Sequence, residues 1–266
     1  METNKLTKQI PQYSLGKILS VWALAAIPMG FLGWVVAPAF AQDPSKPSFE
    51  RLAILTIGLV WQFLLVIILL YQETGTLQWS IIKERLWLNS PHATNTDENN
   101  NRLWWWIIPL LLLTTIFELL LLGPIEKVWV SIFPFFAEPA GFSLGSNLTT
   151  SEAQSQLVGA WGIYALFLIQ ALFNTVLGEE LLFRGLLLPR MKGAFGKWDW
   201  VMNGFLFGIY HLHQPWGMFT SALEGIFLLA FPSRKFRSAW FGIILHSGQS
   251  IFFAILLLGL VLGLAK

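Results

Sequence analysis

The sequence has no cysteine among its 266 residues, so disulfide bonds and catalysis by a thiol are excluded. Charge is also scarce, because Asp, Glu, Lys and Arg make up 12% of the chain, whereas soluble domains carry about 25%. The His-Glu-x-x-His motif of zinc proteases is absent, and no internal repeat is visible. These absences argue against a soluble domain, a disulfide scaffold and the usual zinc-protease helix.

Long apolar runs dominate what is present. Hydrophobic residues make up 55% of the chain, and the mean hydropathy is +0.60. About 20 consecutive apolar residues suffice to cross the hydrocarbon core of a bilayer. We therefore predict an all-α, polytopic membrane protein with about seven transmembrane helices, of which the fifth and sixth are short enough to be tilted, half-buried or re-entrant. The candidate runs are Ile18–Ala39, Leu52–Tyr71, Leu103–Gly123, Leu157–Glu179 continuing to Leu188, Trp200–Leu212, Trp216–Phe231 and Ala239–Leu264.

Lysine and arginine are distributed unevenly between the two sides that these runs define. If the N-terminus is cytoplasmic, 13 basic residues lie inside and 4 lie outside. Because cytoplasmic loops carry the excess of Lys and Arg, we predict a cytoplasmic N-terminus. The first 17 residues are polar and the following apolar run is long, so Ile18–Ala39 is expected to be a retained anchor. The net charge of +2 arises from these loops, and we expect contacts with membrane lipids and none with nucleic acid.

No targeting signal is visible, which fits a bacterial inner membrane or an organelle of bacterial ancestry. A thylakoid membrane and the endoplasmic reticulum are the alternatives. The expected localisation is therefore a multi-pass position in a bacterial plasma membrane.

The chain divides into two parts near residue 156. We predict an N-terminal membrane scaffold with about three transmembrane helices in residues 1–155, and a domain carrying the functional site in residues 156–266. The second part places ionisable residues inside apolar runs, where a charge costs roughly 2.5–3.5 kcal/mol on insertion scales. Such residues usually face a polar interior and serve a function. They are Glu179, Glu180, Arg184, His211, His213 and His246, and Ser250 lies on the same helix face as His246.

The spacing of these residues indicates how they can act together. Glu180 and Arg184 are four apart and can pair on one helix face, whereas Glu179 lies about 100° round the helix and points to other partners. A carboxylate and a neutral imidazole can hold a water molecule and remove its proton. A second histidine with a hydroxyl or amide donor can stabilise the oxyanion that forms when that water attacks a carbonyl. The pattern therefore favours peptide-bond hydrolysis in a small polar chamber.

A zinc-like divalent ion is an alternative way to activate the water, since histidine and glutamate are zinc ligands. Glu179, His211 and His246 would then hold the metal. His213 lies two residues further on and competes with His211 for this role. Otherwise no cofactor is expected.

Three motifs occur in order along the second part. Glu-Glu-x-x-x-Arg begins at Glu179, Phe-x-x-x-His begins at Phe207, and His-x-x-x-Ser begins at His246. Together they resemble the signature of the CPBP family of intramembrane proteases, which comprises CAAX proteases and bacteriocin-processing (Abi) proteins. The resemblance covers roughly Leu157–Phe253. It implies an all-α catalytic domain whose C-terminal helices form a conical polar chamber open toward the cytoplasm.

The resemblance also implies a role for each motif residue. The family usually has Asn or Asp where this chain has Ser250, which puts the oxyanion role of that position in question. Both a metal-dependent and a glutamate-only mechanism have been argued for the family. By carry-over, Glu179 and His211 would activate the water, Glu180 and Arg184 would orient the site, and His246 and Ser250 would bind the oxyanion.

The implied function is an intramembrane endopeptidase, of glutamate or metallo type, that cuts a peptide or a membrane-protein tail near the membrane surface. Ser250 leaves an alternative, a weak or inactive relative that acts as a membrane scaffold or immunity-type binding protein. A proton-coupled transporter that uses the glutamates and histidines as a relay is the third hypothesis. Transporters commonly show paired repeats, which this sequence lacks.

Overall fold

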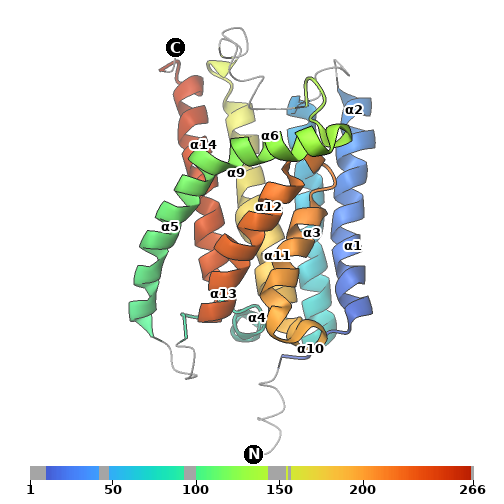
Figure 1. Cartoon of the computed structure of the whole chain (residues 1–266), viewed down its shortest axis with the longest axis vertical. Coiled ribbons are helices and arrows are strands. Elements are labelled where there is room, and N and C mark those ends of the chain that lie inside the picture. Colours follow the sequence, from blue (N-terminus) through green and yellow to red (C-terminus); the bar gives the residue numbers. More distant parts are fainter. Residues whose placement is uncertain (1–9, 42–47, 93–99, 143–153, 155–156, 265–266) are drawn as a thin grey trace, which may run out of the picture.

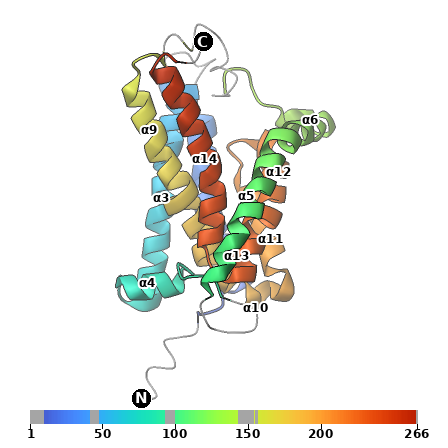
Figure 2. The ribbon, with the colours of Figure 1, turned by 90° about the vertical axis from the view of Figure 1, so that its left-hand side faces the viewer.

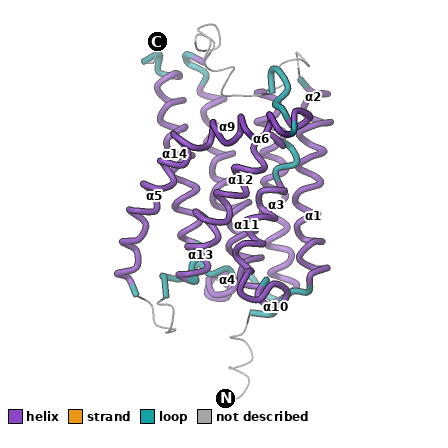
Figure 3. Tube along the Cα trace, in the orientation of Figure 1, coloured by secondary structure: helices purple, strands orange, loops and turns teal. Residues whose placement is uncertain are grey.

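The computed structural model consists of helices joined by loops and turns, and no strand occurs in the described residues (Figure 3). These residues are 10–41, 48–92, 100–142, 154 and 157–264. The predicted all-α class is therefore confirmed. The predicted boundary at residues 155 and 156 falls outside the described residues, so the division into two domains stays a prediction.

Within the described residues, five helical segments are long and apolar enough to cross a membrane. Successive segments run in opposite directions through the molecule (Figures 1 and 2). Large apolar side chains such as Ile108, Leu112 and Leu119 are exposed on them. The chain is thus a multi-pass membrane protein, as predicted. The segments are Leu15–Phe40 (α1, Leu15–Phe31, to α2, Ala37–Phe40), Glu50–Thr74 (in α3, Ser48–Thr74), Asn101–Ile132 (α5, Ile107–Ile116, to α6, Gly123–Ile132), Trp161–Arg190 (beginning with α9, Trp161–Leu172) and Trp240–Val261 (α14).

The fifth and sixth predicted spans form a helical hairpin. Helix α11 (Asp199–Tyr210) enters it, and α12 (Met218–Glu224) and α13 (Phe231–Phe236) return to the same end of the molecule (Figure 1). Both arms are shorter than the five long segments, so the predicted seven spans correspond to five long segments and this hairpin. The arms approach closely because Gly208 has no side chain, and a Cβ atom there would overlap with Ala222.

Four side chains from other elements hold the hairpin near its tip, and each binds a backbone carbonyl oxygen. The Trp22 indole donates to Leu206 at 2.8 Å, and the Trp34 indole donates to Leu212 at 2.8 Å. An indole N–H needs such a partner when it is buried, since no water reaches it. The other two bonds run from Arg51 Nη2 to His213 at 2.9 Å and from Trp129 Nε1 to Pro215 at 2.9 Å.

An ion pair joins two of the long segments at the end of the molecule where the N-terminus lies. Arg190 is fully buried, and its Nε and Nη2 atoms donate to the two carboxylate oxygens of Glu73 at 2.8 and 2.9 Å. Arg190 Nη1 also donates to the carbonyl oxygens of Arg85 and Leu186. The forked guanidinium therefore ties the end of α3 to the end of the α9 segment.

We expect the substitution Glu73→Ala to destabilise the protein strongly. Removing one partner of a buried ion pair leaves an uncompensated charge, which costs about 3–5 kcal/mol. Thermal unfolding in detergent, followed by circular dichroism, should show a lowered midpoint. Lys83→Ala, at an exposed position on α4 (Trp79–Arg85), is the control and should unfold like the wild type. An unchanged midpoint for Glu73→Ala would show that the pair contributes nothing.

Candidate active site

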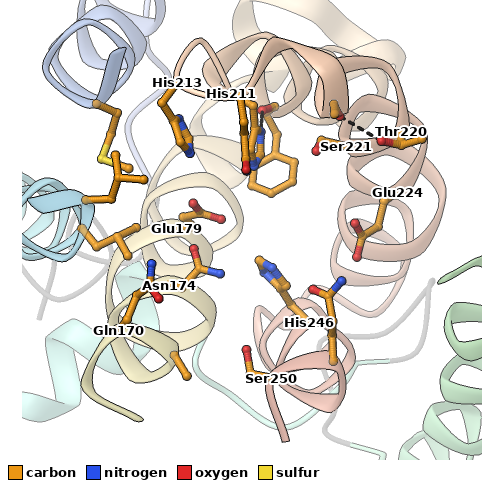
Figure 4. A pocket seen from close by; sticks show the side chains of 18 of the residues that line it. Gln170, Asn174, Glu179, His211, His213, Thr220, Ser221, Glu224, His246 and Ser250 are labelled. Atoms are coloured by element: carbon orange, nitrogen blue, oxygen red, sulfur yellow. Dashed lines mark hydrogen bonds between the residues drawn. The ribbon is translucent and has the colours of Figure 1, made fainter. Parts of the chain in front are cut away.

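A cavity of about 280 Å³ lies between the α9 segment, the hairpin and α14. Glu179, His211, His246 and Ser250 all line it, so the structure brings these four predicted residues together. Figure 4 shows their side chains around one open space. His213, the competing histidine, lies in the turn after α11 and lines the same cavity. We call this cavity the chamber.

Glu179 lies almost completely buried at one wall of the chamber, with 2% of its surface exposed. The Tyr210 hydroxyl donates a hydrogen bond to Glu179 Oε1 at 3.1 Å, and Gln62 Nε2 donates to that hydroxyl at 2.7 Å. This chain of two bonds fixes one carboxylate oxygen. Tyr210 and Gln62 are thus positioning residues, and they come from α11 and α3.

Glu180 makes different contacts, as the 100° offset between the two glutamates predicts. Its Oε1 atom accepts hydrogen bonds from Arg184 Nη1 at 2.8 Å and from His246 Nδ1 at 3.0 Å. The predicted pairing of Glu180 with Arg184 is therefore observed, and it also reaches the last helix. Glu180 and Arg184 have no exposed surface, and the guanidinium lies 4.1 Å from the centre of the Phe207 ring.

The backbone of α14 makes room for this ion pair. Gly242 lies one helical turn before His246, and a Cβ atom at this position would overlap with Glu180 Oε2. It would also lie 3.1 Å from Arg184 Cγ. A glycine is thus needed here because the buried carboxylate packs against the helix backbone itself.

His211 is held by its own helix. Its Nδ1 atom lies 2.9 Å from the carbonyl oxygen of Phe207, one turn earlier, and the Phe207 ring packs edge-on against the imidazole. A carbonyl oxygen can only accept, so the neutral imidazole carries its proton on Nδ1 and leaves Nε2 as an acceptor. The Phe-x-x-x-His spacing thus has a physical basis, since the phenylalanine supplies both the carbonyl and the ring contact.

Glu179 and Glu180 lie between two π-helical segments, η5 (Phe173–Gly178) and η6 (Leu181–Leu187). π-helical turns inside α-helices are rare and often occur at functional sites. Their bonds join residues five apart, and Asn174, five residues before Glu179, lines the chamber with it (Figure 4). The wider turn therefore brings an amide beside the carboxylate.

Sequence reasoning missed several residues of the chamber wall. Glu224 of α12 faces the chamber opposite Glu179 and is 92% buried (Figure 4). It lies in the sixth apolar run, so the rule that found the other ionisable residues would also have found it. Nothing in the local sequence marks the remaining ones, because their position depends on helix packing. They are Gln170, Asn174, Thr220 and Ser221.

The zinc alternative stays a prediction. Among the residues that the structure describes, no group of three or more His, Asp or Glu side chains is placed so that it could hold a metal ion. Glu179, His211 and His246 line one chamber but do not converge as ligands. Nδ1 of each histidine is bonded, to Phe207 and to Glu180, which leaves Nε2 of each imidazole as the possible ligand atom.

The motif residues lie within the range that matches a known family. Residues 160–252 match the family model for the type II CAAX prenyl endopeptidase Rce1-like proteins. This part of the chain is similar to that family, and we refer to it below as the Rce1-like region. The resemblance to CAAX proteases predicted from the three motifs is thereby confirmed, and all six predicted site residues fall inside the Rce1-like region. No curated protein and no solved structure matches the chain.

The chamber of the Rce1-like region extends in one direction only. The lining residues of the α9 segment are Phe167, Gln170, Ala171, Asn174 and Glu179, and this segment begins at the end of the molecule where the C-terminus lies (Figure 1). After Glu179, every residue up to Met191 is buried and none lines the chamber. A cytoplasmic N-terminus and a chamber open toward the cytoplasm were both expected. In this structure they exclude each other.

Proposed function

We propose that the chain is an intramembrane endopeptidase of the CAAX-protease type, in which Glu179 activates the attacking water. The main support is the convergence of a buried carboxylate and two imidazoles on one chamber within the Rce1-like region. His211 and His246 are each bonded through Nδ1, which leaves both Nε2 atoms available to a bound peptide and water. A carboxylate and two imidazoles are the groups that general base catalysis with oxyanion stabilisation requires.

In the first step, a water molecule donates one hydrogen bond to Glu179 and one to Nε2 of His211. Glu179 takes a proton from this water as the oxygen attacks the carbonyl carbon of the substrate. The new C–O bond forms and the carbonyl π electrons move to oxygen, which gives a tetrahedral oxyanion. Tyr210 holds the carboxylate in place throughout, because its hydroxyl donates to Glu179.

In the second step, Glu179 passes its proton to the amide nitrogen, and the C–N bond breaks to release the amine and the new carboxylic acid. Protonated Nε2 of His246 donates to the oxyanion until then, and Glu180 balances the imidazolium charge through Nδ1. The Ser250 hydroxyl and the Asn174 amide line the chamber near this position. Either donor can replace the Asn or Asp that the family usually carries at position 250.

Cleavage of a quenched fluorescent peptide library by the purified protein in liposomes tests this proposal. We expect the wild type to cleave, and His246→Ala to lose most of that activity, since one oxyanion donor is worth about 10²–10³ in rate. A chelator should leave the wild type unaffected. Activity lost on chelation would replace the glutamate mechanism with a metal-dependent one.

An inactive wild type would favour the scaffold or immunity-type alternative instead. The variant Ser250→Asn then decides what was lost. Cleavage gained on restoring the amide would show a degenerate enzyme whose oxyanion site is incomplete. Continued inactivity in a folded Ser250→Asn protein would count against the protease proposal.

A further inference from the structure

We propose that the chamber is entered from the extracytoplasmic face of the membrane, so that the substrate is a peptide segment exposed on that side. That the entering peptide is a substrate rests on the proposed function, whereas the side from which the chamber is entered does not. Three features of the structure support this direction: the closed end of the chamber, its open end, and the charge of the two faces.

The chamber is closed toward the end of the molecule where the N-terminus lies. Residues 178–191 are buried without a break, and they fill the space between Glu179 and that end. The segment before α5 seals the neighbouring side, since the carbonyl oxygens of Trp87 and Leu88 accept hydrogen bonds from the backbone of Ala239 and the indole of Trp240. Trp104 stacks on Phe241 just outside. Among the described residues, none beyond Glu179 on the α9 segment lines the chamber, so the chamber ends on this side.

The opposite end of the chamber is bordered by α6. This helix crosses the tip of the hairpin (Figures 1 and 2), and Thr220 of the hairpin donates a hydrogen bond to Glu126 of α6 at 3.2 Å. Glu126 and Phe167, on α6 and α9, are both lining residues and both lie on this side of Glu179. The chamber lining therefore continues to α6 and α9, away from the closed end.

The charge of the two faces identifies which one is cytoplasmic. Exposed basic residues gather at the closed end, on the ends of α1, α4, α5, α10 (Lys192–Phe195) and α13. At the other end, the described residues include only Arg51, which is buried, and Lys127. Because basic residues accumulate on the cytoplasmic side, the closed end faces the cytoplasm and the chamber opens away from it. The exposed basic residues of the closed end are Lys17, Lys83, Arg102, Lys192, Lys197, Lys235 and Arg237.

The absence of cysteine makes this inference directly testable. Single cysteines can be placed in the chamber (Ser221→Cys), on the closed end (Lys197→Cys) and on α6 (Lys127→Cys). Each variant, expressed in a bacterial membrane, is treated with a membrane-impermeant trimethylammonium methanethiosulfonate in sealed right-side-out vesicles and in inverted vesicles. The cationic reagent suits a chamber lined by glutamates.

We expect Ser221→Cys to react in right-side-out vesicles together with Lys127→Cys, and to lose this reaction in inverted vesicles, where Lys197→Cys reacts. Reaction of Ser221→Cys on the same side as Lys197→Cys would overturn the proposal. The proposal would also be overturned if Ser221→Cys reacted in neither type of vesicle but did react once the protein was solubilised. The two surface variants report the orientation independently of the chamber. Because labelling requires no hydrolysis, its failure is distinguishable from a failure of the protease proposal.

Discussion

The substitution Glu179→Gln should abolish peptide hydrolysis while leaving the protein folded. The amide keeps the shape of the side chain and its carbonyl oxygen can still accept from Tyr210, but it cannot take a proton from water. Loss of a general base costs about 10²–10⁴ in rate. The ratio of kcat/KM for the wild type and the variant in liposomes measures this loss.

Glu84→Gln is the matched control, because Glu84 is an exposed glutamate on α4, at the closed end of the molecule. It should cleave like the wild type. Both variants should also unfold at the wild-type temperature, which separates a chemical effect from a structural one. Full activity of Glu179→Gln would remove this residue from the mechanism and with it the proposed water activation.

Arg184→Met should be the most destabilising change in the site, because it leaves Glu180 buried without its guanidinium partner. Removal of one member of a buried pair costs about 3–5 kcal/mol, whereas replacing both members with neutral groups of similar size is often close to neutral. The double variant Glu180→Gln/Arg184→Met should therefore recover most of the stability lost in Arg184→Met. Chemical unfolding of the three proteins measures both effects.

Activity should not recover in that double variant. Glu180 also accepts the Nδ1 hydrogen bond of His246, and a glutamine cannot balance the imidazolium charge that oxyanion binding requires. The stable double variant is thus expected to cleave far more slowly than the wild type. If it cleaves normally, the Glu180–Arg184 pair serves stability alone and His246 is oriented by other contacts.

The parts of the site that depend on helical spacing were predictable from the sequence. Glu180 and Arg184 pair because four residues make about one turn, and His211 bonds to the carbonyl oxygen of Phe207 for the same reason. The contrast between Glu179 and its neighbour also follows from helix geometry. Local sequence determines these contacts, so they need no knowledge of which helices are neighbours.

The contacts between helices were not predictable in this way. Gln62 reaches Tyr210 across 148 positions of the chain, and no periodicity in either segment indicates this bond. The short lengths of the fifth and sixth runs allowed several arrangements, and close packing of the two arms, at Gly208 against Ala222 and at Gly204 against Ile226, accompanies the hairpin. The direction of the chamber likewise depends on which residues fill the space beyond Glu179.

The hydrogen bonds that hold the hairpin have a consequence for which substitutions the protein tolerates. All four anchoring bonds end on main-chain carbonyl oxygens, those of Leu206, Leu212, His213 and Pro215. Every amino acid carries a main-chain carbonyl group, so these four hydrogen bonds do not depend on which side chain each accepting residue has. At the partly exposed positions Leu212 and Gln214, the tip can therefore accept new side chains while its position at the chamber stays constant. Such a tip is a natural place to graft altered selectivity.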